Sequence, residues 1–323
     1  MTALKLAIAC AVDAALGDPA DWPHPVRFIG GACVLGERLA RAYARGDARR
    51  ESFGGTLLCV VIVGGTYLAA RTALRAAYRA DSRFGFVFET VLGGTTLAAR
   101  NLLDEASAVI ASLERGDLAQ ARLSVARIVG RDTAQLNVSE ISRATIETLA
   151  ESACDGIVAP LLALAIGGVP LALAFKAVST LDSMIGHIEL PYTYLGRTAA
   201  RLDDLACYVP ARATALFIAW CAPLTGEDRK CALAVLRADG HRHRSPNAGR
   251  PEAALAGAIG VRLGGTNRYD GVANQTPYLG PKSPPPTVRS ARRALRLVGA
   301  SAFVAAAALI LISTIVHAYT AFS

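Results

Sequence analysis

The chain has 323 residues, of which 53% are hydrophobic and 19% are charged, and its mean hydropathy is +0.36. This balance lies outside the usual range of soluble proteins and predicts an integral membrane protein. The formal net charge is +8. Because the basic residues are not interleaved with aromatic ones, as they are on nucleic-acid surfaces, we expect no nucleic-acid partner and place the charge in cytoplasmic loops.

Apolar segments that approach or exceed the length of a membrane helix recur along the chain. The first sixteen residues contain Lys5 and Asp13 and no convincing cleavage site, so we interpret them as an uncleaved, short first helix. Five more segments follow, at 54–74, 84–103, 157–178, 205–224 and 297–320. The sequence therefore predicts an all-α, polytopic membrane protein in a lipid bilayer, with about five to six membrane helices.

The segment 157–178 allows two interpretations. Its first part, GIVAPLLALAIGG, is only about half the length of a membrane helix, and the GGVP that overlaps its end contains residues that break or turn helices. The segment either crosses once or folds back as a re-entrant pair of short helices, which is tolerated where protein or water shields the backbone.

Three long polar segments, 18–53, 100–155 and 225–296, carry 6, 6 and 13 of the 34 Lys and Arg residues. If each apolar segment crosses once, all three lie on one side of the membrane, which the positive-inside rule makes the cytoplasm. Helical spacing of apolar residues predicts helices in 100–155, with a capping box at Asp132 and Gln135 and a helix cap at Ser139. We expect one membrane-embedded domain over 1–323 with helical cytoplasmic loops.

Three acids, Glu147, Glu151 and Asp155, recur at four-residue intervals, one turn after Arg143. This spacing places them on one helix face. A solvated face with an Arg143–Glu147 pair would explain such a row on a surface helix. Here the row ends where an apolar segment begins, and acids at a membrane boundary are costly unless they are paired or bind something. We therefore favour a metal site at these carboxylates, most simply for Mg²⁺.

A proline-rich stretch, LGDPADWPHPVRFIG (16–30), follows the first helix. Its prolines fix the backbone, so that His24 and Arg27 project from a stiff loop. Arg27 suits a carboxylate or phosphate, and His24 could carry a proton at neutral pH. A rigid connector explains the stretch equally well.

A basic stretch, HRHRSPNAGRPE (241–252), leads into a predicted helix. Arginines beside a helix start form a natural anion site, and the turn residues expose backbone amides. The candidate binding residues are Arg244, Ser245, Asn247 and Arg250. A basic loop that touches anionic lipid is the alternative.

A fourth group of polar residues lies in STLDSMIGH (179–187) and the GRTAARLDD that follows. Asp182, His187 and Arg197 are candidates for catalysis or binding. Asp203 and Asp204 could equally well cap a helix.

Together these stretches resemble a known family. LGDPADWPHPVRFIG, ETLAESACDGIVAPL, KAVSTLDSMIGH, GRTAARLDDLACYVPAR and SPNAGRPEAALAGAIGVRLGG are similar, in this order, to signature blocks of the CobD/CbiB family, the membrane-bound adenosylcobinamide-phosphate (cobinamide) synthases of cobalamin biosynthesis. The resemblance extends over about residues 13 to 271, and the quoted blocks run from Leu16 to Gly265.

The resemblance implies an amide ligase that joins aminopropanol, free or as its O-phosphate, to a propionate carboxylate of adenosylcobyric acid, with ATP as co-substrate. Activating a carboxylate and coupling it to an amine needs acids for Mg²⁺, cations for phosphates and a base. The chain has no P-loop, so ATP has no recognised cradle. The groups above supply the residue types: Glu147, Glu151, Asp155, His24, Asp182 and His187 for catalysis, and Arg27, Arg143, Arg197, Arg244, Ser245, Asn247 and Arg250 for binding.

Two other functions remain open from the sequence. A transporter would use Asp13, Glu151, Asp155 and Asp182 as an intramembrane relay, but the charged stretches lie in long loops and no inverted repeat is visible. A membrane sensor or scaffold is the second, because the family has a distant AmpE-type regulatory relative. If the protein is the enzyme, we expect it in the inner membrane with an active site that faces the cytoplasm. The sequence leaves open whether it assembles with other pathway enzymes or with a second copy of itself.

Overall fold

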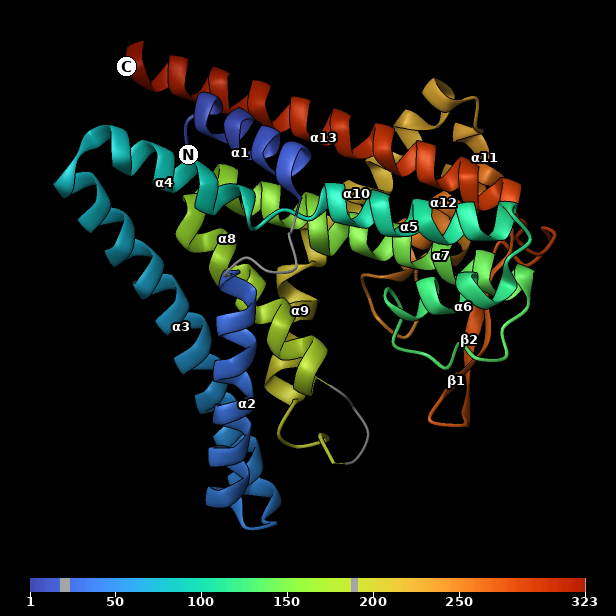
Figure 1. Cartoon of the computed structure of the whole chain (residues 1–323), viewed down its shortest axis with the longest axis horizontal. Helices are drawn as coiled ribbons and strands as arrows, with labels where there is room; N and C mark the ends of the chain where they lie inside the picture. Colours follow the sequence, from blue (N-terminus) through green and yellow to red (C-terminus); the bar gives the residue numbers. More distant parts are fainter. Residues whose placement is uncertain (18–23, 187–190, 323) are drawn as a thin grey trace. The chain divides into compact units, whose positions relative to one another are not determined.

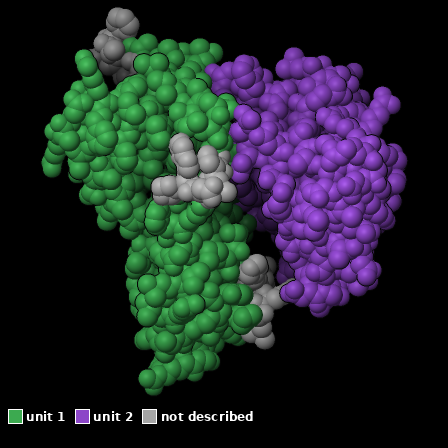
Figure 2. Space-filling view, in the orientation of Figure 1, with its two compact units in different colours: residues 1–98, 159–207, 308–323 green, residues 99–158, 208–307 purple. Residues whose placement is uncertain are grey.

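The computed structural model describes residues 1–17, 24–186 and 191–322, and these residues are mainly helical (Figure 1). The strands among them form one two-stranded sheet. The all-α class is thus confirmed, with a small hairpin added. The contacts divide the chain, which we expected to be one domain, into two compact units: unit 1 is 1–98, 159–207 and 308–323, and unit 2 is 99–158 and 208–307 (Figure 2).

Unit 1 is built on the long helix α3, which packs against α2, α4 and α8. Its core joins Cys33 of α2 and Leu58 of α3 to Leu181 and Ile185 of α8. Its helices are α1 (Ala3–Leu16), α2 (Pro25–Ala44), α3 (Ala48–Ala80), α4 (Ser82–Gly94), α8 (Ala159–Ile185), α9 (Arg197–Ala206) and the end of α13 (Val288–Phe322).

Helix α8 is interrupted where the sequence contains GGVP. Gly168 has φ 67° and ψ −164°, two residues before Pro170. Pro170 lacks an N–H, and a positive φ is readily adopted only by glycine, so this sequence cannot continue a regular helix. The predicted break is therefore present. It does not distinguish a single crossing by 157–178 from a re-entrant pair, because both interpretations contain it.

Within the described residues, three helical stretches are long and apolar enough to cross a membrane: Ala48–Ala80, Val138–Ile185 and Val288–Val316. The bent pair Arg197–Ala206 and Tyr208–Thr225 makes a fourth if it counts as one span. This is fewer than the five to six expected, because α1 and α4 have only 14 and 13 residues. A helix that crosses the hydrocarbon core needs roughly 20.

Unit 2 surrounds a short buried helix, α12, of which every residue except Arg250 is buried. It packs against α7, α10 and α11. The elements of unit 2 are α5 (Ala99–Glu114), α6 (Leu118–Ala126), α7 (Val138–Ser152), the π-helix η1 (Ala153–Val158), α10 (Tyr208–Cys221), the 3₁₀ turn η2 (Ala222–Thr225), α11 (Arg229–Asp239), α12 (Gly249–Ile259), β1 (Leu263–Tyr269), β2 (Val272–Leu279) and the first part of α13.

The hairpin of β1 and β2 turns at Asp270 and Gly271, whose φ angles are 49° and 79°. An Asp-Gly pair with positive φ at both residues is typical of a tight hairpin turn. The Asp132 carboxylate accepts hydrogen bonds from both turn N–H groups, at 3.2 and 2.8 Å. Asp132 therefore holds this turn and is not part of the capping box that we expected with Gln135.

The start of α7 also differs from the expectation. Asn137 is its N-cap and forms a reciprocal capping box with Glu140. Ser139, the expected cap, lies inside the helix and donates to the carbonyl oxygen of Pro286 at 2.8 Å. Asn137-x-x-Glu140 has the same capping-box spacing as Asp132-x-x-Gln135, and only the Asn137 pair lies at a helix start.

Candidate active site

A polar pocket of about 260 Å³ lies within unit 2, between α7, the 128–131 loop, the 243 loop, α12 and the hairpin. Its charged and imidazole-bearing lining residues are Arg131, Glu147, Glu151, His243 and Glu252. The elements that meet here are far apart in the sequence, so only the folded unit assembles the pocket. Acids, an arginine and a histidine around one cavity are the usual marks of a catalytic or binding site.

Glu147 is the buried centre of an ion-pair network. Its Oε2 lies 2.5 Å from Nη2 of Arg131, and its Oε1 lies 3.5 Å from Nη1 of Arg143. The same Oε1 accepts a hydrogen bond of 2.9 Å from the Gly264 N–H. A buried carboxylate with two arginines and a backbone donor is compensated within the protein.

Arg143 links α7 to the hairpin. It donates to the carbonyl oxygens of Gly264 and Thr266, at 2.7 and 2.9 Å, and to Oδ1 of Asn267 at 2.9 Å. Arg131 donates to the same Asn267 oxygen at 2.5 Å. The Arg143 guanidinium, a predicted substrate-binding group, therefore uses its donors mainly to fix β1 against α7.

Glu252 is the acid with the most unusual environment in the pocket. It is only 6% exposed, and among the residues that the structure describes its side chain makes no hydrogen bond or ion pair. Burial, together with the charges of Glu147 and Glu151, raises its pKa well above the usual 4.5. A buried acid without a partner, in a polar pocket, is a candidate for binding a cation or for proton transfer.

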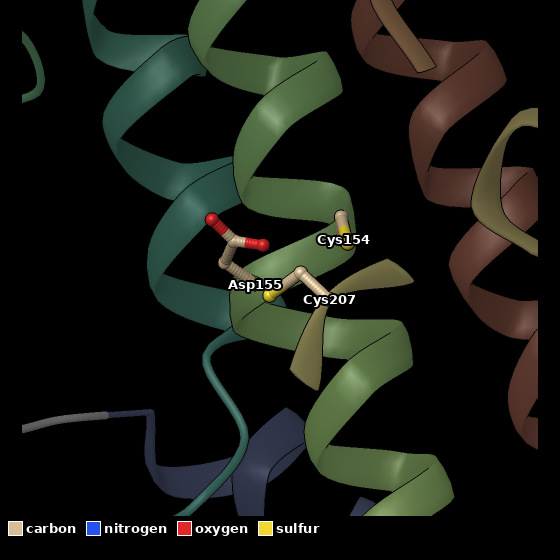
Figure 3. Close-up of side chains that lie close together, drawn as sticks. All are labelled: Cys154, Asp155 and Cys207. Atoms are coloured by element: carbon tan, nitrogen blue, oxygen red, sulfur yellow. The ribbon is translucent and has the colours of Figure 1, made fainter. Parts of the chain in front are cut away.

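Glu151 lies one turn after Glu147, lines the same pocket and is exposed. The expected acidic face thus holds for these two residues. Helix α7 ends at Ser152, and Asp155 lies in the π-helix that follows, beside Cys154 (Figure 3). A π-helix changes the angle between successive residues, and Asp155 is not among the residues that line the pocket.

His243 lines the pocket from the basic loop. Its Nδ1 accepts a hydrogen bond of 3.0 Å from the Ser245 N–H, so the neutral ring carries its proton on Nε2. Burial lowers the pKa of His243 below its usual 6.5. His243 is therefore mainly neutral near pH 7 and can donate a hydrogen bond from Nε2.

The basic loop is tightly built just before α12. Ser245 Oγ accepts from the N–H groups of Asn247 and Ala248, both at 3.2 Å. Asn247 is 5% exposed, and the Nε of Arg250 is buried without an acceptor among the described residues. Ser245, Asn247 and Arg250 thus lie together around the start of α12, and Arg244 is exposed in the same loop.

The other predicted residues belong to unit 1. His24 caps α2, its Nδ1 accepting from the Val26 N–H at 3.3 Å, and Arg27 lies in the first turn. Asp182 is near the end of α8, and Arg197 begins α9. His187 lies outside the described residues.

Arg131, His243, Glu252 and Asn267 were not among the predicted site residues. For Glu252 a signal was present, since it is the one acid in PEAALAGAIG, an otherwise apolar stretch. Such a helix is expected to be buried, and a buried acid is rarely without a role. Arg131 and Asn267 carry no comparable signal, because only the folded unit brings the 128–131 loop and β1 to the Glu147 network.

Comparison with known proteins gives a consistent result. The model of the CobD/Cbib protein family matches residues 6–298. "Cobalamin biosynthesis protein CbiB" of Salmonella typhimurium is 42% identical over 310 residues, which are 96% of this chain and 97% of that protein. "Cobalamin biosynthesis protein CobD" of Geobacter metallireducens is 45% identical over 287 residues, 89% of each chain. No solved structure is significantly similar to the chain.

Proposed function

Because the chain belongs to the CobD/Cbib protein family, we propose that it is an enzyme of cobalamin biosynthesis. In this proposal it joins a propionate carboxylate of adenosylcobyric acid to aminopropanol or its O-phosphate. The product is adenosylcobinamide or its phosphate. The resemblance to the synthases supports this reaction, and the pocket offers groups that suit it.

The proposed reaction proceeds in two steps. The corrinoid carboxylate attacks the γ-phosphorus of ATP, giving an acyl phosphate and ADP. The amine then attacks the acyl carbon, phosphate leaves, and the ammonium proton passes to a base. Both steps concentrate negative charge on phosphate oxygens, which a cation and arginine side chains stabilise.

The observation that carries the site assignment is the buried carboxyl group of Glu252, which has no partner among the described residues and lines the same pocket as Glu151. Two acids at one pocket repel each other unless a proton or a cation lies between them. Oxygen ligands of this kind suit Mg²⁺, so we assign Glu151 and Glu252 as the groups that would hold it. When bound there, Mg²⁺ would neutralise the phosphate groups of the nucleotide.

The remaining residues have supporting roles in this proposal. Glu147 with Arg131 and Arg143 fixes the pocket wall, as their hydrogen bonds indicate. His243 donates from Nε2 to a substrate oxygen. Arg244 and Arg250, with the amides of the Ser245–Asn247 turn, bind an anionic group of a substrate.

A reconstituted assay tests the proposal. The purified full-length protein is given adenosylcobyric acid, aminopropanol or its phosphate, ATP and Mg²⁺, and mass spectrometry detects the amide. We expect product with the wild type and a loss of at least about a hundredfold with Glu252→Gln, since the variant keeps the shape and removes a ligand. Glu105→Gln changes a half-buried acid that is paired with Arg127 in the same unit; it is the matched control and should retain activity.

Two outcomes would contradict the assignment. No amide from the wild type with either amine would overturn the reaction. Normal turnover of both Glu252→Gln and Glu151→Gln would leave the reaction intact and overturn the site.

A further inference from the structure

A row of arginines occupies one face of the C-terminal part of α3, in unit 1. Arg71, Arg75 and Arg79 recur at four-residue intervals, so they lie on the same side of the helix, and all three are exposed. We call them the arginine row. They line a pocket of about 630 Å³ together with residues of α4 and α8.

The arginine row has no anionic partner in the described part of the chain. None of its three side chains makes a hydrogen bond or ion pair there. Glu89, the acid that lines the pocket, is already bound by Lys5 Nζ and Tyr78 Oη, each at 2.6 Å. Three like charges one turn apart repel one another, so the row favours an anion from outside the chain.

The position of the arginine row along α3 indicates how deep in the membrane that anion would lie. The helix has 33 residues, about 50 Å, whereas the hydrocarbon core of a bilayer is about 30 Å thick. Residues 54–70 carry no charge, and Arg71 is the first charged residue after them. The row thus begins where the helix would leave the hydrocarbon and reach the level of lipid phosphates.

Apolar side chains precede the row on the same side of the helix. Val61 and Leu68, seven residues apart, are 57% and 58% exposed, and Leu68 is one turn before Arg71. A free phosphate would gain nothing from these surfaces, whereas the acyl chains of a lipid would cover them.

We propose that the arginine row binds the phosphate headgroup of an anionic phospholipid, whose acyl chains lie on the exposed apolar side chains of α3. Guanidinium groups bind phosphate oxygens in pairs, and basic pockets between membrane helices are known to hold anionic headgroups. The inference concerns unit 1 alone and does not depend on the proposed reaction.

Lipid retention measured by native mass spectrometry tests the proposal. The full-length protein in detergent is offered equal amounts of phosphatidylglycerol and phosphatidylcholine, with and without excess inorganic phosphate. The wild type should retain phosphatidylglycerol preferentially. Arg71→Gln/Arg75→Gln/Arg79→Gln should lower that preference about tenfold or more.

The matched control removes three exposed arginines elsewhere in unit 1, as Arg38→Gln/Arg49→Gln/Arg50→Gln. It should keep the wild-type preference. An equal loss in both triple variants would show general charge attraction and overturn the site. Displacement of the lipid by inorganic phosphate would show a free-phosphate site and overturn the lipid assignment. If the triple variant is poorly folded, Arg75→Gln alone should still reduce retention, and unchanged retention would contradict the proposal.

Discussion

Glu147 and Glu151 are one turn apart on α7, and their environments differ sharply. Glu147 is 7% exposed and compensated by two arginines and a backbone N–H. Glu151 is exposed at the pocket. The two glutamates therefore have different roles. Glu147 stabilises the fold of unit 2, and in our proposal Glu151 binds the metal.

Thermal unfolding of the detergent-purified protein separates these two roles. Glu147→Gln leaves Arg131 and Arg143 without their carboxylate, and we expect it to lower the free energy of unfolding by about 3 kcal/mol. Glu151→Gln should change it by less than about 0.5 kcal/mol. Similar stability of the two variants would show that the buried network does not support unit 2.

Glu252 should make the stability of the protein depend on pH. Its pKa is raised in the folded state, so above the unfolded value of about 4.5 the folded state holds more protons than the unfolded one. Stability is therefore lost as the pH rises from about 4.5 toward the folded pKa.

Glu252→Gln removes this penalty. We expect the variant to be more stable than the wild type by about 1 kcal/mol at pH 8 and nearly equal to it at pH 4.5, as measured by thermal unfolding without added Mg²⁺. Added Mg²⁺ should then stabilise the wild type and not the variant. A stability difference that is the same at both pH values would exclude titration of Glu252 as its cause.

At the scale of elements, the pocket depends on close approach between α12 and the basic loop. A Cβ built on Gly249, the first residue of α12, would lie 2.4 Å from the His243 Cβ and 3.2 Å from the Gly240 carbonyl oxygen. Only glycine allows the helix to start this close to His243. The glycine thus positions a pocket residue without touching the pocket itself.

Gly249→Ala tests this positioning. We expect the substitution to displace His243 and to lower the free energy of unfolding by about 2 kcal/mol, as measured by thermal unfolding. It should also lower the rate of amide formation. Gly130→Ala, where an added Cβ meets nothing within 4 Å, should leave stability unchanged. Equal stability of both variants would show that the loop containing His243 can move to accommodate the added Cβ without loss of stability.

At the scale of the whole molecule, we predict the orientation in the membrane from charge. The 225–296 segment carries 13 of the 34 basic residues, and basic loops remain in the cytoplasm. Unit 2 contains this segment as well as the proposed pocket. Its placement on the cytoplasmic side would give the pocket access to ATP.

Reporter fusions after Arg131 and after Gly226 test the orientation. We expect both to be active as cytoplasmic reporters and inactive as periplasmic ones. The control is a fusion in a segment that we expect on the periplasmic side, assayed in parallel. A periplasmic signal after either residue would contradict the orientation.

The sequence by itself determined the class of the protein, the break in α8 and two of the three acids at the pocket. These features depend on local properties: the excess of apolar residues, the GGVP stretch, and the four-residue spacing of Glu147 and Glu151, which the helix converts directly into one face. The same local signals misplaced the cap of α7, because two capping-box patterns occur five residues apart. They also left the Asp270-Gly271 hairpin unpredicted, although its turn is a recognisable signal.

Only the tertiary structure decided which charges meet. Asn267 and Glu252 lie far from Glu147 in the sequence, and they come close to it because α12 packs against α7 and because Arg143 fixes the hairpin to α7. The environment of Asp155 was likewise decided by the π-helix that follows Ser152. Ion pairing and burial depend on distances across the fold, and residue spacing within one helix carries no information about them.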